Sequence, residues 1–90
     1  MLMVTEAAKQ KLKETLLNNT EDQTAGLRLK IKSPGQFGLV LDNQSPADDV
    51  IEHKGLKVLL VGQEIAELLQ EATLDVQDTP DGPRLTIFQV

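Results

Sequence analysis

Residues 25–42, AGLRLKIKSPGQFGLVLD, decide the fold. Apolar and charged side chains alternate along GLRLKIKS, which is typical of a strand with one buried and one wet face. Leu27, Leu29 and Ile31 belong to the buried face. The letters SPGQ then favour a turn, and FGLVLD continues as a second strand. This stretch therefore predicts a strand, a turn and a returning strand.

A helix is expected ahead of this hairpin, over residues 6–19. Its apolar residues recur at four-residue spacing, at Ala8, Leu12 and Leu16, which places them on one side of a helix. Thr5 precedes the first turn and offers an N-cap. The apolar run MLMV at the start of the chain predicts a short first strand.

Four more strands and a second helix are expected after the hairpin. VIEHK and LKVLLV are two strands divided by a tight turn at Gly55. Gly62 precedes a helix over residues 63–72, and residues 73–90 form a last hairpin that turns at TPDGP. The helix is expected to bury the residues at its i, i+3, i+4 and i+7 positions, Ile65, Leu68, Leu69 and Ala72.

The resulting element order is β-α-β-β-β-β-α-β-β, with about seven strands and two helices. Hairpin-linked strands, with helices that do not alternate with them strand by strand, indicate an α+β fold with small mixed or antiparallel sheets. No repeat, low-complexity tract or linker interrupts the 90 residues. We therefore expect a single domain over residues 1–90.

Composition and charge exclude several classes of function. A formal net charge of −5, with two Phe and no Tyr or Trp, argues against binding to nucleic acid or to an anionic membrane. The charge is uneven: residues 1–32 carry six Lys/Arg against four Asp/Glu, and residues 33–90 carry three against ten. The uneven charge could orient a partner, although two solvent-exposed faces of different charge explain the distribution more simply. Without a signal peptide or a bilayer-length apolar run, we expect a cytoplasmic protein.

His53 is the only histidine and follows three acidic residues, Asp48, Asp49 and Glu52. Imidazole and carboxylates together can bind a divalent metal or transfer protons. In a strand, however, Glu52 and His53 point to opposite faces, and zinc sites need several ligands at suitable spacing. The four residues are a candidate metal site, but the pattern favours a structural role for His53 at the surface or beside the turn.

Other polar residues give no catalytic arrangement. Ser33 and Ser45 lie beside prolines in turns, where hydroxyl groups usually bond locally. Arg28, Lys30 and Lys32 share the wet face of the first hairpin strand, where they could bind an anionic partner or, more simply, keep the strand soluble. We therefore expect no enzymatic activity.

The order of the motifs resembles that of the A-type iron–sulfur carriers, the HesB-like domain family. In both, an opening helix leads to a GLRL-type strand, a Gly-Cys-Ser-Gly-type turn and another strand. The turn here consists of Gly35, Gln36, Phe37 and Gly38. The resemblance continues through DDVIEHKGLKVLLVGQEIAELLQEATLDV, so it implies one HesB-like domain over residues 1–90.

This sequence departs from the family at the residues that would bind iron or an iron–sulfur cluster. The resemblance implies one cysteine in the turn and two near a Cys-x-Cys tail, which hold iron or a cluster across a dimer. This sequence has no cysteine; Gln36 takes the first position, and LTIFQV ends the chain where the tail would begin. Gln is a weak ligand, and thiolates hold clusters. We therefore expect no cofactor, and only Gly35 and Gly38, whose backbone freedom suits a turn, would remain of the site.

Three functions follow from these observations. The first is a non-catalytic accessory protein that keeps the scaffold and acts through protein contacts, with iron–sulfur assembly factors as partners and a homodimer as one arrangement. The second is a small-molecule or metal-binding protein that reuses the turn at residues 35–38. In it, Gln36 and Phe37 line the site and His53 with its neighbouring carboxylates supplies ligands. The third, an enzyme, has no supporting arrangement of residues.

Overall fold

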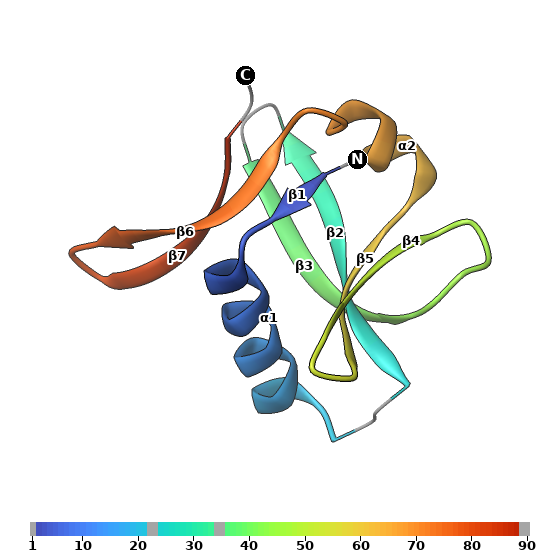
Figure 1. Cartoon of the computed structure of the whole chain (residues 1–90), viewed down its shortest axis with the longest axis horizontal. Helices are drawn as coiled ribbons and strands as arrows, with labels where there is room; N and C mark the ends of the chain where they lie inside the picture. The colour runs from blue at the N-terminus through green and yellow to red at the C-terminus, as the bar shows by residue number, and fades with distance from the viewer. Residues whose placement is uncertain (1, 22–23, 34–35, 89–90) are drawn as a thin grey trace.

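The computed structural model describes residues 2–21, 24–33 and 36–88, and this part forms two helices and two sheets (Figure 1). The three-stranded sheet has the order β1-β6-β7, with β1 (Met3–Val4), β6 (Thr73–Thr79) and β7 (Gly82–Phe88). The four-stranded sheet has the order β3-β2-β5-β4, with β2 (Ala25–Ser33), β3 (Gln36–Asn43), β4 (Asp49–His53) and β5 (Leu56–Val61). The helices are α1 (Glu6–Asn19) and α2 (Gln63–Leu68). The predicted α+β class and element order are confirmed.

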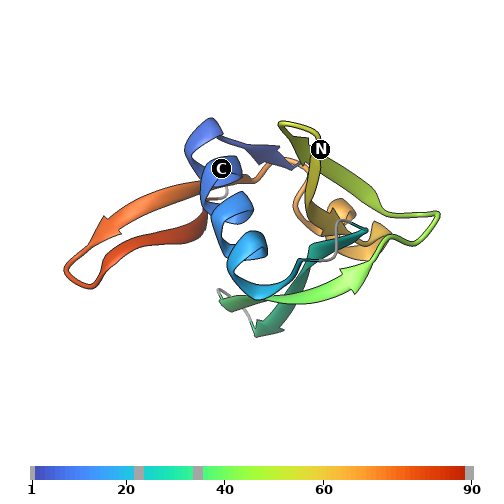
Figure 2. The same ribbon diagram turned by 90° about the horizontal axis from the view of Figure 1, so that it is seen from below.

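Both sheets are mixed. β1 pairs with β6 and β2 pairs with β5 in parallel, whereas the pairs β2–β3, β4–β5 and β6–β7 are antiparallel hairpins. The β6–β7 hairpin extends away from the four-stranded sheet in two perpendicular views (Figure 1, Figure 2). The predicted ends of the chain include residues 1, 89 and 90, which lie outside the described residues.

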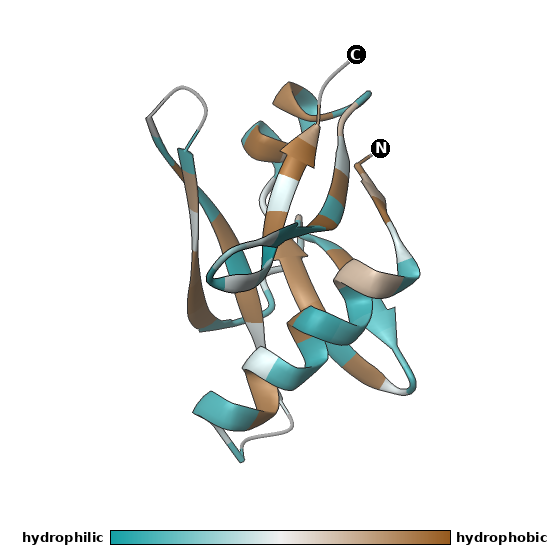
Figure 3. Ribbon diagram, turned by 90° about the vertical axis from the view of Figure 1, so that its left-hand side faces the viewer, coloured by the Kyte–Doolittle hydropathy of each residue, from teal (hydrophilic) through white to brown (hydrophobic). Residues whose placement is uncertain are grey.

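α1 has the bounds that the sequence predicts. Thr5 is its N-cap, and the Thr5 hydroxyl oxygen accepts a hydrogen bond of 3.1 Å from the Ala8 amide. The apolar stripe of the helix is buried against strands of both sheets, and its opposite side is polar (Figure 3). Burial of each large aliphatic side chain contributes about 1.5–3 kcal/mol. The central residues of this core are Leu12, Leu16, Leu27, Leu29, Val58, Leu59, Val61 and Leu74.

The tight turn between β4 and β5 is also confirmed. Lys54 and Gly55 form its two central positions, and both have positive φ angles, 52° and 84°. Two successive residues with positive φ match the right-handed twist of the flanking strands, and glycine adopts this conformation without steric cost.

The predicted second helix is wrong in its length. α2 ends at Leu68 rather than at residue 72, and the Leu68 side chain is 69% exposed. Leu69 and Ala72 are buried as expected, but from the turn after the helix. The Ala72 amide bonds to the Leu69 carbonyl and the Met3 amide bonds to the Ala72 carbonyl, so the chain leaves the helix in order to pair beside β1.

One residue of the first hairpin also differs from expectation. Ile31 was predicted to be buried with Leu27 and Leu29, yet it is 41% exposed. It lies beyond the part of β2 that the core covers, next to the hairpin turn. Within the described residues, no helix is long and apolar enough to cross a membrane.

Candidate functional site

Three of the four residues that the resemblance places in a turn belong to a strand instead. Gln36, Phe37 and Gly38 all belong to β3, and Gly35 lies outside the described residues. Gln36 is exposed, whereas Phe37 is half-buried and packs against the core. Because a strand holds these positions, neighbouring side chains point to opposite faces of the sheet and do not converge on one ligand.

Gly38 serves a purpose other than backbone freedom. It lacks the positive φ that Gly55 and Gly82 have, and it pairs with Lys30 inside the β2–β3 ladder. A methyl group built on Gly38 would lie only 2.7 Å from Cε and 3.3 Å from Nζ of Lys32. The missing side chain therefore makes room for the end of the Lys32 side chain to lie over Gly38, which corrects the expectation that Gly38 shapes a turn.

Arg28, predicted to be a solvated cation, is instead the centre of a partly buried ion-pair network. Its side chain is 11% exposed. Nε donates to Asp42 over 2.6 Å, while Nη1 and Nη2 donate to the two oxygens of Asp48 over 2.8 and 2.7 Å. Asp48 also accepts a bond of 2.7 Å from the Ser45 amide. The network therefore fixes the connection between β3 and β4 to the middle of β2.

The same contacts shift the protonation of all three groups. Hydrogen bonds from Arg28 hold the pKa of Asp42 and the pKa of Asp48 below their usual range. The hydrogen bonds to Asp48 and then to Asp42 raise the pKa of Arg28. Both carboxylates and the guanidinium are therefore charged at neutral pH, and the cation is occupied by its partners.

The four candidate metal ligands are not brought together. Asp48 binds Arg28, and Glu52 is exposed. His53 is only 9% exposed, so it is not a surface residue, although it does adjoin the turn. Its Nε2 lies 3.3 Å from Oε1 of Gln10 on α1. Among the described residues, no group of three His, Cys, Asp or Glu side chains is placed to hold a metal ion.

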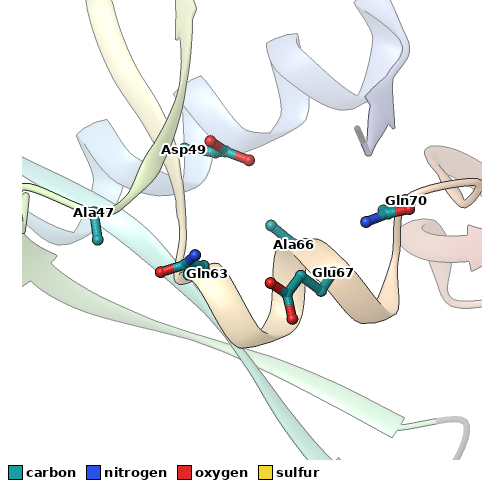
Figure 4. A pocket seen from close by; sticks show the side chains of 6 residues that line it. All are labelled: Ala47, Asp49, Gln63, Ala66, Glu67 and Gln70. Atoms are coloured by element: carbon teal, nitrogen blue, oxygen red, sulfur yellow. The ribbon is translucent and has the colours of Figure 1, made fainter.

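Asp49 lines a shallow pocket of about 560 Å³ between β4, the loop before it and α2 (Figure 4). Glu67 supplies a second carboxylate, and two carboxamides complete the polar lining. The sequence gives no signal for this pocket beyond Asp49, because the loop and α2 are distant in the chain. Its lining residues are Ala47, Asp49, Gln63, Ala66, Glu67 and Gln70.

Solved structures with this fold include two A-type iron–sulfur carriers, SufA and IscA. SufA from Escherichia coli, a protein involved in the biosynthesis of iron–sulfur clusters, is 24% identical, with a TM-score of 0.70 over 98% of this chain and 84% of SufA. IscA, solved with a [2Fe-2S] cluster, is 19% identical, with a TM-score of 0.65 over 99% of this chain and 85% of IscA. A protein from Aquifex aeolicus is 22% identical, with a TM-score of 0.69 over 99% and 91% of the two chains.

The fold that the resemblance implies is therefore confirmed: this chain has the SufA/IscA-like fold over nearly its whole length. No protein-family model matches the chain, and no curated protein matches it.

The residues present do not fit an iron–sulfur cluster. A [2Fe-2S] cluster is held by four cysteine thiolates, or by two cysteines and two histidines in some centres. These 90 residues contain no cysteine and one histidine, and that histidine packs against α1. The start of β3 and the end of β7 lie toward the same end of the molecule (Figure 1). The scaffold around the expected site is present, but the ligand chemistry is not.

Proposed function

We propose that this chain is a thiol-free relative of the A-type iron–sulfur carriers that acts as a non-catalytic accessory factor in iron–sulfur cluster assembly. It keeps the fold of a carrier and contacts proteins of the assembly machinery, but it holds no cluster itself. The observation that carries this proposal is the pairing of a SufA-like fold over 98% of the chain with Gln36 at the place of the expected cysteine.

The charge distribution supports a role in protein contacts. The exposed cations Lys30 and Lys32 lie on β2, beside the strand that contains Gln36. The other part of the chain, residues 33–90, carries ten acidic residues against three basic ones. Oppositely charged regions on one small domain favour an oriented approach to a charged protein surface.

The alternative function, a ligand site at residues 35–38, gains nothing from the pocket in Figure 4. That pocket lies beside α2, and none of its lining residues belongs to the turn. Gln36 and Phe37 are consecutive residues of a strand, so their side chains point to opposite faces of the sheet.

Anaerobic reconstitution with ferrous iron and sulfide tests the proposal. We expect the parent chain to retain no stoichiometric iron or sulfide after desalting, whereas IscA, which has been solved with a [2Fe-2S] cluster, serves as the positive control when treated in the same way. Gln36→Cys is expected to behave like the parent, because one thiolate per chain gives at most two in a dimer and a cluster takes four ligands. Leu41→Cys, an exposed position on the same strand, is the matched control for a thiol outside the turn.

Two results would contradict this account. A cluster that survives desalting on the parent chain would make it a carrier with unrecognised ligands. A stable [2Fe-2S] spectrum on Gln36→Cys but not on Leu41→Cys would show that the scaffold still supplies the remaining ligands. Absorbance together with iron and sulfide quantification distinguishes these results.

A further inference from the structure

α2 presents an acidic surface around one exposed leucine. Ile65 packs against the core and Leu69 is buried, so these two residues attach the helix to the rest of the molecule. Glu64, Glu67 and Leu68 are exposed, and their i, i+3 and i+4 spacing places them together on a side of the helix that faces solvent. At 69%, Leu68 is the most exposed of the large apolar side chains that the structure describes. A single exposed leucine is common on protein surfaces, so its surroundings decide whether it has a partner.

The pocket in Figure 4 adjoins this surface. Glu67 belongs to both, because it lines the pocket and is next to Leu68 in the helix. Asp49 of β4 supplies a second carboxylate from across the pocket. The remaining lining residues are two alanines and two glutamines, so no basic side chain of the described residues lines it. The side chains that line the pocket are therefore either neutral or acidic.

Neither carboxylate of the pocket is neutralised within the part of the chain that the structure describes. Asp49 is half-buried, Glu67 is exposed, and neither has an ion pair or a hydrogen bond to its side chain there. Arg28 comes close, since its Nη1 lies 3.8 Å from a methyl group built on Gly62, but two other carboxylates bind its guanidinium. Partial burial of a carboxylate costs free energy unless a cation or a hydrogen-bond donor faces it. The pocket therefore favours a positively charged occupant.

We propose that this surface docks a basic segment of a partner protein, which inserts an arginine side chain into the pocket and packs an apolar side chain on Leu68. A guanidinium has five N–H donors and no acceptor, so it matches carboxylate and carboxamide oxygens together. The pocket is shallow and four of its six lining residues are polar, whereas sites for small molecules are mostly apolar and enclose their ligand. An arginine that reaches in from a larger protein surface suits this shape, and the same surface covers Leu68.

This docking mode names the chemistry of the partner for the protein contacts in the proposed function. It rests on that function only in requiring that the chain acts through protein contacts, whichever pathway the partner belongs to. The basic segment is complementary in charge to Asp49, Glu64 and Glu67, the acidic residues of the pocket and of the exposed side of α2.

Titration of a short peptide into the isotopically labelled parent chain, followed by NMR, tests the proposal. The probe is the blocked peptide Leu-Ala-Ala-Arg, and the control peptide has citrulline in place of arginine, which keeps the shape of the side chain and removes its charge. We expect the arginine peptide to give saturable shifts of the Ala47, Ala66 and Glu67 amide signals, and to bind more weakly as salt is raised. The citrulline peptide should bind at least about tenfold more weakly, because hydrogen bonds between charged groups are the stronger ones.

Isosteric variants test the two carboxylates of the pocket. Asp49→Asn should weaken binding of the arginine peptide by about tenfold, and Glu67→Gln, at an exposed position, by about two- to fivefold. Asp78→Asn is the matched control, because it removes the same charge from an exposed position near the tip of the β6–β7 hairpin; it should change the affinity by less than about twofold. Leu68→Ser should weaken binding by about two- to tenfold through loss of the apolar contact. Urea unfolding of each variant checks that its fold is intact.

Equal affinity for the two peptides, or no saturable binding of either, would overturn the proposal. Equal losses for Asp49→Asn and Asp78→Asn would also overturn it, because the peptide would then respond to net charge rather than to the pocket. Shifts of the same amides with calcium but with neither peptide would make the pocket a metal site, and shifts that follow the concentration of the parent chain would assign the surface to a second copy. Either result would contradict a basic partner. Failure to recover assembly factors from cells would leave all of these results unchanged, so the two proposals can fail separately.

Discussion

The hairpins β2–β3 and β6–β7 are alike in topology and differ in how the molecule holds them. β2–β3 lies within the larger sheet and is fixed by the ion pairs of Arg28 with Asp42 and Asp48. β6–β7 extends away from that sheet, and its own arginine, Arg84, lies 3.9 Å from Asp81 with both side chains mostly exposed. The first hairpin is fixed by partly buried ion pairs, whereas the second has only weak, exposed polar contacts.

The two hairpins therefore differ in how much their polar contacts contribute to the stability of the fold. The first hairpin contains the position at which the resemblance places a cluster ligand, and it also contains Arg28, the centre of the ion-pair network with Asp42 and Asp48. The second contributes apolar residues such as Leu74 to the core, but its arms reach into solvent. The position that the resemblance assigns to a cluster ligand therefore lies in a well-supported part of the fold, although no cysteine occupies it.

Removal of the two arginines gives the largest expected contrast. Arg28→Met should lower the free energy of unfolding by about 3–5 kcal/mol, because it leaves the buried carboxylate of Asp48 without its cation. Arg84→Met should change it by less than about 0.5 kcal/mol, since exposed ion pairs contribute little. Urea unfolding of both variants is the measurement. Similar losses for the two variants would contradict the difference between the hairpins.

Two glycines of the first hairpin give an intermediate contrast. A methyl group on Gly26 would lie 3.0 Å from the carbonyl oxygen of Lys57 and 3.1 Å from Cγ of buried Leu60. Gly26→Ala should therefore destabilise the fold by about 1–3 kcal/mol. At Gly38 the obstacle is the flexible end of Lys32, so Gly38→Ala should stay within about 0.5 kcal/mol of the parent in urea unfolding. A larger loss at Gly38 than at Gly26 would restore a backbone role for Gly38.

A smaller effect is expected where the second hairpin joins α1. The Thr5 hydroxyl donates to Asp75 on β6 over 2.7 Å and accepts from the Ala8 amide. Thr5→Ala should cost about 1 kcal/mol, the usual loss for an N-cap, while Thr5→Ser should retain most of the stability. Thermal unfolding followed by circular dichroism compares them. Equal losses in both variants would indicate that the Thr5 methyl group, rather than the hydroxyl, matters.

Acid should remove the stability that the carboxylates of the network contribute at neutral pH. Because the pKa values of Asp42 and Asp48 are lowered by folding, their contribution is complete above the unfolded value of about 3.9 and is lost as the pH falls through the folded values. In Arg28→Met this source of stability is absent. The difference in unfolding free energy between parent and variant should therefore narrow from pH 7 to pH 3; a constant difference would contradict the network.

Local sequence signals were sufficient for most elements of the fold. The cap at Thr5 marked the start of α1, the four-residue spacing from Ala8 marked its buried side, and Gly55 marked the turn between β4 and β5. These features depend on hydrogen bonds and backbone angles within a few residues, so the sequence contains them directly. The element order followed from the same signals, and the resemblance then supplied the family of folds.

Features that depend on distant residues could not be predicted in this way. Arg28 was expected in solvent because its partners lie 14 and 20 residues away, in β3 and in the loop before β4. Leu68 was expected to be buried because its spacing fits a longer helix, but the contact of the following residues with β1 ends that helix early. Periodicity identifies an apolar face; tertiary packing decides how far along the chain that face is covered.

Affinity capture from the source organism, followed by mass spectrometry, tests the central claim most directly. The tagged chain is the bait, and an excess of untagged chain is the competitor that must remove any specific partner. An accessory role in cluster assembly predicts recovery of cluster-assembly scaffolds, a cysteine desulfurase or iron–sulfur client enzymes. Reproducible recovery of unrelated proteins, or of the chain alone, would contradict that role and leave only the fold in common with the carriers.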